Sequence, residues 1–141
     1  MSKKRILVAV MNWGLGHATR SIPVINALQN EHYEPMVASD GAALQLLKKE
    51  FPELTHLELP GYNIQYAKKG WLLNWKIIAQ TSHIRKTIAA EKEKTRQIIK
   101  DYQIEGIISD NRFGVYSDDL KTNVFITHQI HVLSGITTFL S

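Results

Sequence analysis

Cysteine is absent from the 141 residues of the chain. This absence excludes disulfide frameworks, thiolate zinc sites and thiol nucleophiles, and a reducing cytoplasm is the compartment that it suits best. Long apolar runs are also missing, because the longest, 6–11 and 124–126, fall far short of the roughly 20 residues that cross a bilayer. The basic start at Lys3, Lys4 and Arg5 leads into a short apolar run without a small-residue cleavage site, so we expect no secretory signal.

The composition is that of one ordinary globular domain. Hydrophobic residues make up 44% of the chain, which is sufficient to bury a core. The formal charge of +4 and the pI near 9.3 suit an anionic partner, such as phospholipid headgroups or a nucleotide sugar. Nucleic acid is not expected as the partner, because lysine and arginine are spread along the chain without interleaved aromatic residues.

Short apolar runs alternate with segments of helical periodicity. The segment 5–10 is continuously apolar after Arg5, which is typical of a strand buried on both faces of a parallel sheet. We expect strands over 5–10, 35–39, 55–59, 106–109 and 123–126, helices after the first two, and a long helix over 71–102. Because parallel neighbours require crossover connections, this order predicts an α/β, Rossmann-like, doubly wound parallel sheet in a single domain.

Two local features of the helices also carry predictions. Pro23 predicts that the first regular helix begins near Ser21, since proline is best tolerated in a first turn. His17 would then lie in a loop. The middle of the long helix, 91–97, is polar, and we expect it to be solvated.

The first candidate site lies between the first strand and the first helix. Its glycines, Gly14 and Gly16, allow the backbone to approach a ligand closely, and a helix N-terminus attracts anions. His17 and Arg20, three residues apart, are expected to project toward that anion, with Asn12 beside them. The alternative is a tight turn that leaves His17 as a surface histidine.

A second cluster follows the apolar run 106–109. Asp110, Asn111 and Arg112 are expected at the sheet edge that also carries His17, because the carboxyl ends of parallel strands share one edge. A carboxylate at Asp110 would then fix the tautomer of His17 and raise its basicity, as proton removal from a sugar hydroxyl requires. The alternative is an aspartate that caps a helix or a turn.

Two further segments are weaker candidates. His128 and His131 follow the last expected strand, and His128 is interpreted as lining an acceptor pocket, with packing or capping as the alternative. Their spacing lacks further ligands, so we expect no metal, and no cofactor is expected either. Trp71 and Trp75 stand among leucines and lysines, which suits peripheral contact with a membrane or packing of the long helix on the sheet.

The motif Gly-Leu-Gly-His-Ala-Thr-Arg at 14–20 resembles the G-x-G-H-x-x-R loop of GT-B glycosyltransferases. The segments 108–114 and 125–129 are similar to segments of bacterial transferases of this type, in the group that includes the lipid-linked N-acetylglucosaminyltransferase MurG. The resemblance spans essentially the whole chain. It implies that residues 1–141 are the N-terminal, acceptor-side domain of a GT-B fold, truncated so that the C-terminal nucleotide-sugar domain is missing.

The same resemblance implies roles for the residues. His17 would be the catalytic base and Asp110 its orienting partner, and the phosphate or substrate would lie near Gly14, Gly16 and their neighbours (Asn12, Arg20, Asn111, Arg112 and His128). Asp-x-Asp is absent, consistent with metal-independent transfer from a nucleotide sugar to a glycan or lipid-linked acceptor of the cell envelope. This fragment alone would be inactive. The chain would be cytoplasmic, with peripheral contact at the inner face of the membrane.

Two other interpretations remain open. A dinucleotide-binding Rossmann domain would use Gly14, Gly16 and Thr19 as an approximate fingerprint and Asp40 as the ribose-binding acid. Its third glycine is lacking, and His17 stands in the turn that would hold the pyrophosphate. A non-catalytic module that binds an anionic glycan or glycolipid is the other alternative.

Overall fold

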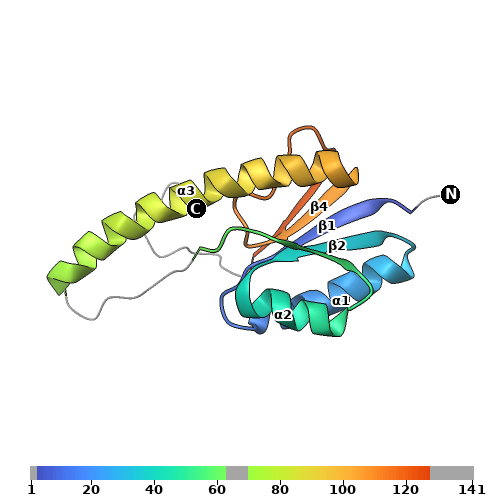
Figure 1. Cartoon of the computed structure of the whole chain (residues 1–141), viewed down its shortest axis with the longest axis horizontal. Helices are drawn as coiled ribbons and strands as arrows, with labels where there is room; N and C mark the ends of the chain where they lie inside the picture. Colours follow the sequence, from blue (N-terminus) through green and yellow to red (C-terminus); the bar gives the residue numbers. More distant parts are fainter. Residues whose placement is uncertain (1–2, 63–69, 128–141) are drawn as a thin grey trace.

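The chain folds as a five-stranded parallel sheet between two layers of helix (Figure 1). The computed structural model describes residues 3–62 and 70–127. The strand order is β3-β2-β1-β4-β5, and every neighbouring pair is parallel. The elements, in chain order, are β1 (Arg5–Val10), α1 (Gly16–Asn30), β2 (Glu34–Ser39), α2 (Gly41–Glu50), β3 (Thr55–Glu58), α3 (Gly70–Tyr102), β4 (Gly106–Asp110) and β5 (Thr122–Ile126).

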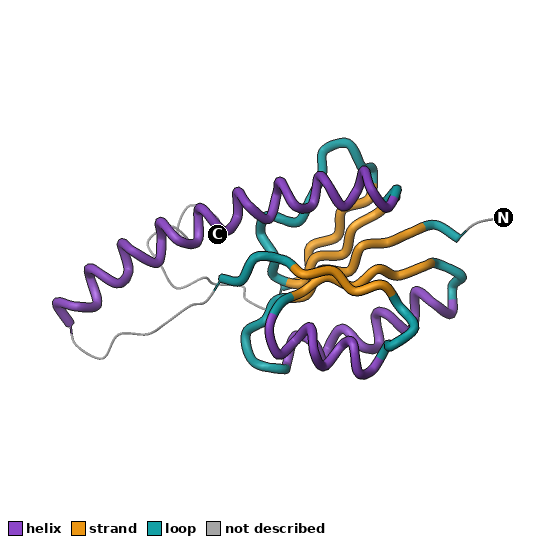
Figure 2. The backbone as a smooth tube through the Cα atoms, in the orientation of Figure 1, coloured by secondary structure: helices purple, strands orange, loops and turns teal. Residues whose placement is uncertain are grey.

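The two faces of the sheet bury separate apolar clusters. α1 and α2 cover one face, and the long α3 crosses the other, as the tube in Figure 2 shows. Successive residues of β1 serve opposite faces, because side chains alternate along a strand. Val8 and Val10 pack under α1 and α2, while Leu7 and Ala9 pack with Ile98 of α3. This double burial explains the unbroken apolar run of β1, and the predicted fold class is confirmed.

The central strands bring the candidate segments to one edge. β1 pairs with β4 so that Val10 stands opposite Asp110, and the next amide, Met11 N, donates to the Asp110 carbonyl at 3.1 Å. The loop before α1 and the turn after β4 therefore leave the sheet side by side.

The first helix begins earlier than Pro23 predicts. α1 starts at Gly16, so Pro23 lies inside it, and His17 is in its first turn. Thr19 secures that turn: its amide and its hydroxyl both donate to the Leu15 carbonyl, at 2.9 and 2.8 Å. Proline removes one backbone hydrogen bond from the helix, and the buried contacts of Ala18 and other residues of α1 with the core offset that loss.

The polar middle of α3 is only partly solvated. Lys92, Glu93 and Lys94 are exposed, as expected, but Glu91 and Thr95 are fully buried against the sheet. The prediction of a solvated segment 91–97 is therefore wrong at the two positions that face inward. Their burial is possible because both are hydrogen-bonded: Thr95 donates to the Glu91 carbonyl at 2.7 Å, and the Glu91 carboxylate is bound by several groups described below.

Candidate functional site

His17 and Asp110 meet at the carboxyl edge of the sheet. His17 is carried by the first turn of α1 and Asp110 is the last residue of β4, so the strand register places one beside the other. The Nδ1 atom of His17 lies 3.2 Å from Oδ1 of Asp110. The contact that the sequence predicted is thus present. Only 8% of the His17 side chain and 4% of the Asp110 side chain are exposed.

Arg20 shares the same carboxylate oxygen. One turn after His17, its Nη2 atom lies 2.5 Å from Oδ1 of Asp110 and 3.0 Å from Nδ1 of His17. The side chain of Arg20 is 38% exposed, so it forms the outer wall of this cluster. The Asp110 carboxylate thus accepts a charge-assisted hydrogen bond from Arg20 beside the His17 imidazole.

The loop before α1 is open on its outer side. Gly14 has φ +69°, which favours glycine, and a Cβ atom at Gly14 or Gly16 would meet nothing within 4 Å. The first turn of α1 contains no acidic residue, and its N-cap, Leu15, makes no side-chain cap bond. The positive end of the helix dipole is therefore not neutralised by a capping side chain, as an anion site requires.

Trp13 and Leu15 are functional candidates that sequence reasoning missed. Both belong to this loop, and they are 44% and 49% exposed, respectively. Their alternation with Gly14 and Gly16 was visible in the sequence. A large apolar side chain on a ligand-binding loop carries no distinct sequence signal, however, because only the fold shows that it does not turn inward.

Asn12 is tied to the start of α2. Its Oδ1 accepts from the Ala43 amide at 3.1 Å, and its Nδ2 donates to Oδ2 of Asp40 at 3.4 Å. The backbone of Gly41 passes so close that a Cβ there would lie 2.2 Å from Nδ2 of Asn12. The amide predicted to contact a ligand thus joins the site loop to its neighbour.

Arg112 lies inside the protein rather than in the open site. Its side chain is 0% exposed, and its guanidinium donates to the carboxylates of Asp40 and Glu91. It also donates to the backbone carbonyls of Val10 at 2.8 Å and Pro60 at 2.9 Å. These partners occupy the guanidinium within the protein, so the geometry supports an anchoring role for Arg112 in place of direct contact with phosphate.

Glu91 is the centre of the same buried network, and the sequence analysis did not find it. Oε2 accepts from Arg112 at 2.8 Å, while Oε1 accepts from the Tyr62 hydroxyl at 2.8 Å and from the Gly114 amide at 2.9 Å. Burial and the adjacent Glu91 carboxylate raise the pKa of Tyr62. A polar stretch in a long helix predicts exposure, so only its contacts identify Glu91 as internal.

Asn111 completes the turn between Asp110 and Arg112. It is buried and has φ 61°, a left-handed conformation that asparagine tolerates better than most residues. Its backbone N–H donates to the Ile126 carbonyl at 3.1 Å, which fixes the turn to β5. This conformation separates the side chains of Asp110 and Arg112, so that one faces the open cluster and the other the buried network.

The remaining predicted residues cannot be placed. His128 and His131 lie outside the described residues. The backbone of Trp71 and Trp75 belongs to α3, but their side chains are likewise outside what the structure describes. The expectations for these four residues stay predictions.

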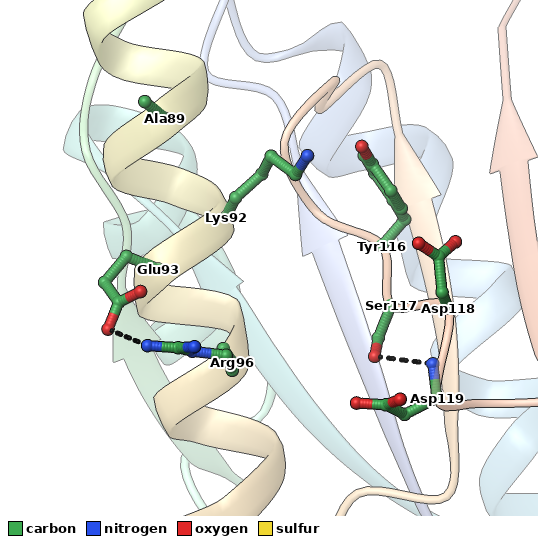
Figure 3. A pocket seen from close by; sticks show the side chains of 8 residues that line it. All are labelled: Ala89, Lys92, Glu93, Arg96, Tyr116, Ser117, Asp118 and Asp119. Atoms are coloured by element: carbon green, nitrogen blue, oxygen red, sulfur yellow. Dashed lines mark hydrogen bonds and ion pairs between the residues drawn. The ribbon is translucent and has the colours of Figure 1, made fainter.

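A hollow of about 280 Å³ lies elsewhere, between α3 and the segment 116–119 (Figure 3). Its wall carries both charges, with Lys92 and Arg96 on α3 and Asp118 and Asp119 opposite. Lys92 Nζ stands 4.8 Å from the centre of the Tyr116 ring, and a hydrogen bond with Tyr116 raises the pKa of Lys92. None of the candidate residues lines this hollow, and we do not place the site there.

The surroundings of Asp40 argue against the dinucleotide-binding alternative. A ribose-binding acid must present a carboxylate to the ligand, but the Asp40 carboxylate is bound by Arg112 and Asn12. Within residues 3–62 and 70–127, no helix is long and apolar enough to cross a membrane. The same residues contain no cluster of three or more His, Cys, Asp or Glu side chains that could hold a metal ion.

Comparison with known proteins identifies a protein family and a shared fold. The sequence profile of glycosyl transferase family 1 matches residues 4–125. A comparison with curated protein sequences finds no match. Among solved structures, the spinosyn rhamnosyltransferase SpnG is similar, with a TM-score of 0.53 and 17% sequence identity. The match covers 79% of this chain and 30% of that one, so it shows a shared fold over a part of the longer protein.

Proposed function

Because the chain belongs to glycosyl transferase family 1, we propose that it is the acceptor-side half of a GT-B glycosyltransferase. The reaction is transfer of a hexosyl or N-acetylhexosaminyl group from a nucleotide sugar to a glycan or a lipid-linked acceptor. The donor is bound mainly by a second domain, and this chain supplies the base and one wall of the cleft. Alone, it binds ligand without turnover.

The pairing of His17 with Asp110 is the observation that carries this proposal. When Nδ1 of His17 donates its proton to Asp110, Nε2 bears a lone pair and can accept a proton. The acceptor hydroxyl gives its proton to Nε2 as its oxygen attacks the anomeric carbon of the donor. The bond from that carbon to the diphosphate breaks, and the nucleoside diphosphate leaves with the electron pair. Asp110 stabilises the imidazolium that forms.

The open loop before α1 is the proposed place for the diphosphate. The amides around Gly14 and Gly16 and the start of α1 offer N–H donors, and Arg20 adds a cation at the same rim. Charge that develops on the leaving phosphate is stabilised there. No metal is needed in this scheme, because the helix terminus and the guanidinium supply the positive charge.

The exposed apolar side chains of Trp13 and Leu15 give weight to a second candidate function, a module that binds an anionic glycolipid without catalysis. Such side chains can lie against a lipid or the apolar face of a sugar ring, and Trp71 and Trp75 would add peripheral contact at the inner membrane face. Both candidates place the protein in the cytoplasm. They differ in whether His17 is needed for chemistry.

The test is glycosyl transfer with and without an added C-terminal donor-binding domain. The chain is combined with the donor-binding domain of a family member to give a two-domain enzyme. Release of nucleoside diphosphate is measured with a panel of nucleotide sugars and acceptors. We expect transfer only with both domains, and its loss in His17→Gln, with Arg96→Gln on the exposed face of α3 as the control. Full transfer by His17→Gln would refute the proposal, and ligand binding without any transfer would favour the glycolipid-binding module.

A further inference from the structure

We propose that Arg20 is a positioning residue that holds Asp110 until a phosphate-bearing ligand draws its guanidinium away, after which Asp110 orients His17 for proton removal. This inference rests on the proposed function. The inference adds a coupling between phosphate binding in the loop before α1 and the tautomer of His17.

Three polar atoms form a closed triangle at the site. Nη2 of Arg20 lies 2.5 Å from Oδ1 of Asp110 and 3.0 Å from Nδ1 of His17, and the third side, from Nδ1 to Oδ1, is 3.2 Å. The guanidinium is therefore nearer to the carboxylate oxygen than the imidazole is. A base and its orienting carboxylate need a direct hydrogen bond, and here the arginine donates to the same oxygen atom and also lies within hydrogen-bond distance of Nδ1.

The triangle provides a partner for either tautomer of His17. With a proton on Nδ1, the ring donates to Asp110, and Nε2 is left with the lone pair that a base requires. With a bare Nδ1, the ring accepts from Arg20, and the proton sits on Nε2, where it blocks proton removal from a substrate. Nδ1 cannot make both hydrogen bonds at once. Arg20 thus supports the tautomer that is inactive as a base.

Withdrawal of Arg20 removes this support. The donor that faces a bare Nδ1 is then gone, while the carboxylate that favours a proton on Nδ1 stays in place. The charge of Asp110 is also no longer shared with a cation, so it stabilises the imidazolium more strongly. Both effects act in the direction of an active base.

The position of Arg20 allows this movement. Its side chain is 38% exposed, whereas those of His17 and Asp110 are 8% and 4% exposed, so the arginine can turn outward while the pair beneath it stays fixed. Arg20 is rooted in the first turns of α1, at the same rim as the open loop around Gly14 and Gly16. A diphosphate offers more charge and more acceptor oxygens to a guanidinium than a single carboxylate oxygen does.

The consequence is an order of events. Proton removal from an acceptor becomes favourable only once the phosphates of the donor occupy the loop. Arg20 thereby couples donor binding to proton removal from the acceptor, and its effect passes through Asp110.

The test follows the ring nitrogens of His17 by NMR in the full chain labelled with 15N-histidine. Their resonances, assigned with His17→Gln, distinguish a proton on Nδ1 from one on Nε2. Inorganic pyrophosphate is the probe, and its binding is followed through the backbone amide resonances of the loop before α1. In the wild type, we expect the Nε2–H signal to be lost as pyrophosphate saturates the loop. In Arg20→Met, we expect that signal to be lost before pyrophosphate is added, with no further change afterwards.

Two controls separate positioning from a general effect of mutation. Arg96→Met removes an arginine from an exposed pair with Glu93 and should leave the wild-type response intact. Arg20→Lys keeps a cation with several donors and should restore both the Nε2–H signal and its loss with pyrophosphate. If lysine and methionine at position 20 behave alike, the charge of Arg20 is not the cause and the proposal is wrong.

Other outcomes also decide the question. An Arg20→Met spectrum identical to the wild type, or wild-type loop amides that respond to pyrophosphate while the His17 ring does not, would overturn the coupling. So would the absence of any pyrophosphate response. The expected tautomer response in a protein whose two-domain enzyme shows no transfer would instead refute the proposed function alone.

Discussion

Arg112 Nη1 and Glu91 Oε2 lie 2.8 Å apart, and neither side chain has any surface exposed to solvent. The pair joins the turn after β4 to the middle of α3, two segments 21 residues apart in the sequence. Burying both charges requires partners for their remaining polar atoms. Tyr62 and the Gly114 amide donate to Glu91, and the Asp40 carboxylate accepts from Arg112. The turn after β4 is therefore fixed to α3 by an ion pair that water does not screen.

Removal of Glu91 should destabilise the protein strongly. Glu91→Ala leaves a buried guanidinium with one carboxylate fewer, and we expect a loss of about 3–5 kcal/mol in the free energy of unfolding. Urea denaturation followed by circular dichroism measures it. The matched control is Glu93→Ala, two residues along the same helix, whose exposed ion pair with Arg96 should cost less than about 1 kcal/mol. Similar losses in the two variants would contradict the anchoring role of Glu91.

Tyr62 should make the stability fall at alkaline pH. Its pKa is raised in the folded protein above the ordinary value of a tyrosine hydroxyl, so the folded state retains the phenolic proton more tightly than the unfolded state. The stabilisation from this group is fully present below pH 10 and is lost as the pH rises toward the folded pKa. The slope reaches at most about 1.4 kcal/mol per pH unit.

The measurement compares the unfolding free energy of the wild type and Tyr62→Phe between pH 8 and about pH 11. We expect the wild type to lose stability relative to the variant above pH 10. Tyr33→Phe, at an exposed position, serves as the control and should parallel the wild type. A constant difference between wild type and Tyr62→Phe across this range would show that the Tyr62 hydroxyl is not buried beside Glu91.

Gly41→Ala should displace the Asn12 side chain and so loosen the loop before α1. The φ of Gly41 is +55°, which alanine adopts at a cost of about 1 kcal/mol or more, and its Cβ would meet the Asn12 side chain at 2.2 Å. We expect Asn12 to lose its contacts with Ala43 and Asp40, and amide hydrogen exchange in residues 12–16 to accelerate. Gly16→Ala, where a Cβ meets nothing within 4 Å, is the contrasting variant and should leave the unfolding free energy nearly unchanged. Equal exchange rates in the loop of Gly41→Ala and of wild type would argue against this linkage.

Asp110→Asn should lower turnover in the two-domain enzyme while substrate affinity changes little. The amide retains the shape of the carboxylate but not the charge that stabilises the imidazolium, so kcat should fall by about 10²–10⁴-fold with a nearly constant KM. Steady-state kinetics measure this split. Asp119→Asn, on the wall of the hollow beside α3, is the control. A rise in KM with an unchanged kcat would assign Asp110 to binding in place of catalysis.

The sequence predicted most of the framework because its signals were local. The unbroken apolar run of β1, the periodicity of α1 and α2 and the alternation of strands with helices all follow from burial on both faces of a parallel sheet. The meeting of His17 with Asp110 followed from the same rule, since His17 lies in the helix that follows β1, Asp110 ends β4, and these two strands are neighbours.

Sequence reasoning failed where long-range contacts override a local preference. Arg112 was predicted to bind a ligand because it follows a strand at the expected site edge. Its buried partner Glu91 was predicted to be solvated because it stands in a polar stretch of a long helix. Each residue is stabilised in the interior by the other and by partners from distant segments, so neither position could be predicted alone. Pro23 led to a helix start that was predicted too late in the chain, because the packing of α1 outweighs the loss of one backbone hydrogen bond.

Within the described residues, two of the groups that receive hydrogen bonds from Arg112 are the main-chain oxygens of Val10 and Pro60. Any amino acid provides such an oxygen. Replacement of the side chains at these two positions therefore leaves both acceptors in place, provided that the backbone path is kept. Among these four hydrogen-bond acceptors, only those of Asp40 and Glu91 depend on the identity of a side chain. Residues at the rim of the candidate site can therefore change toward new ligands while the contacts of Arg112 are kept.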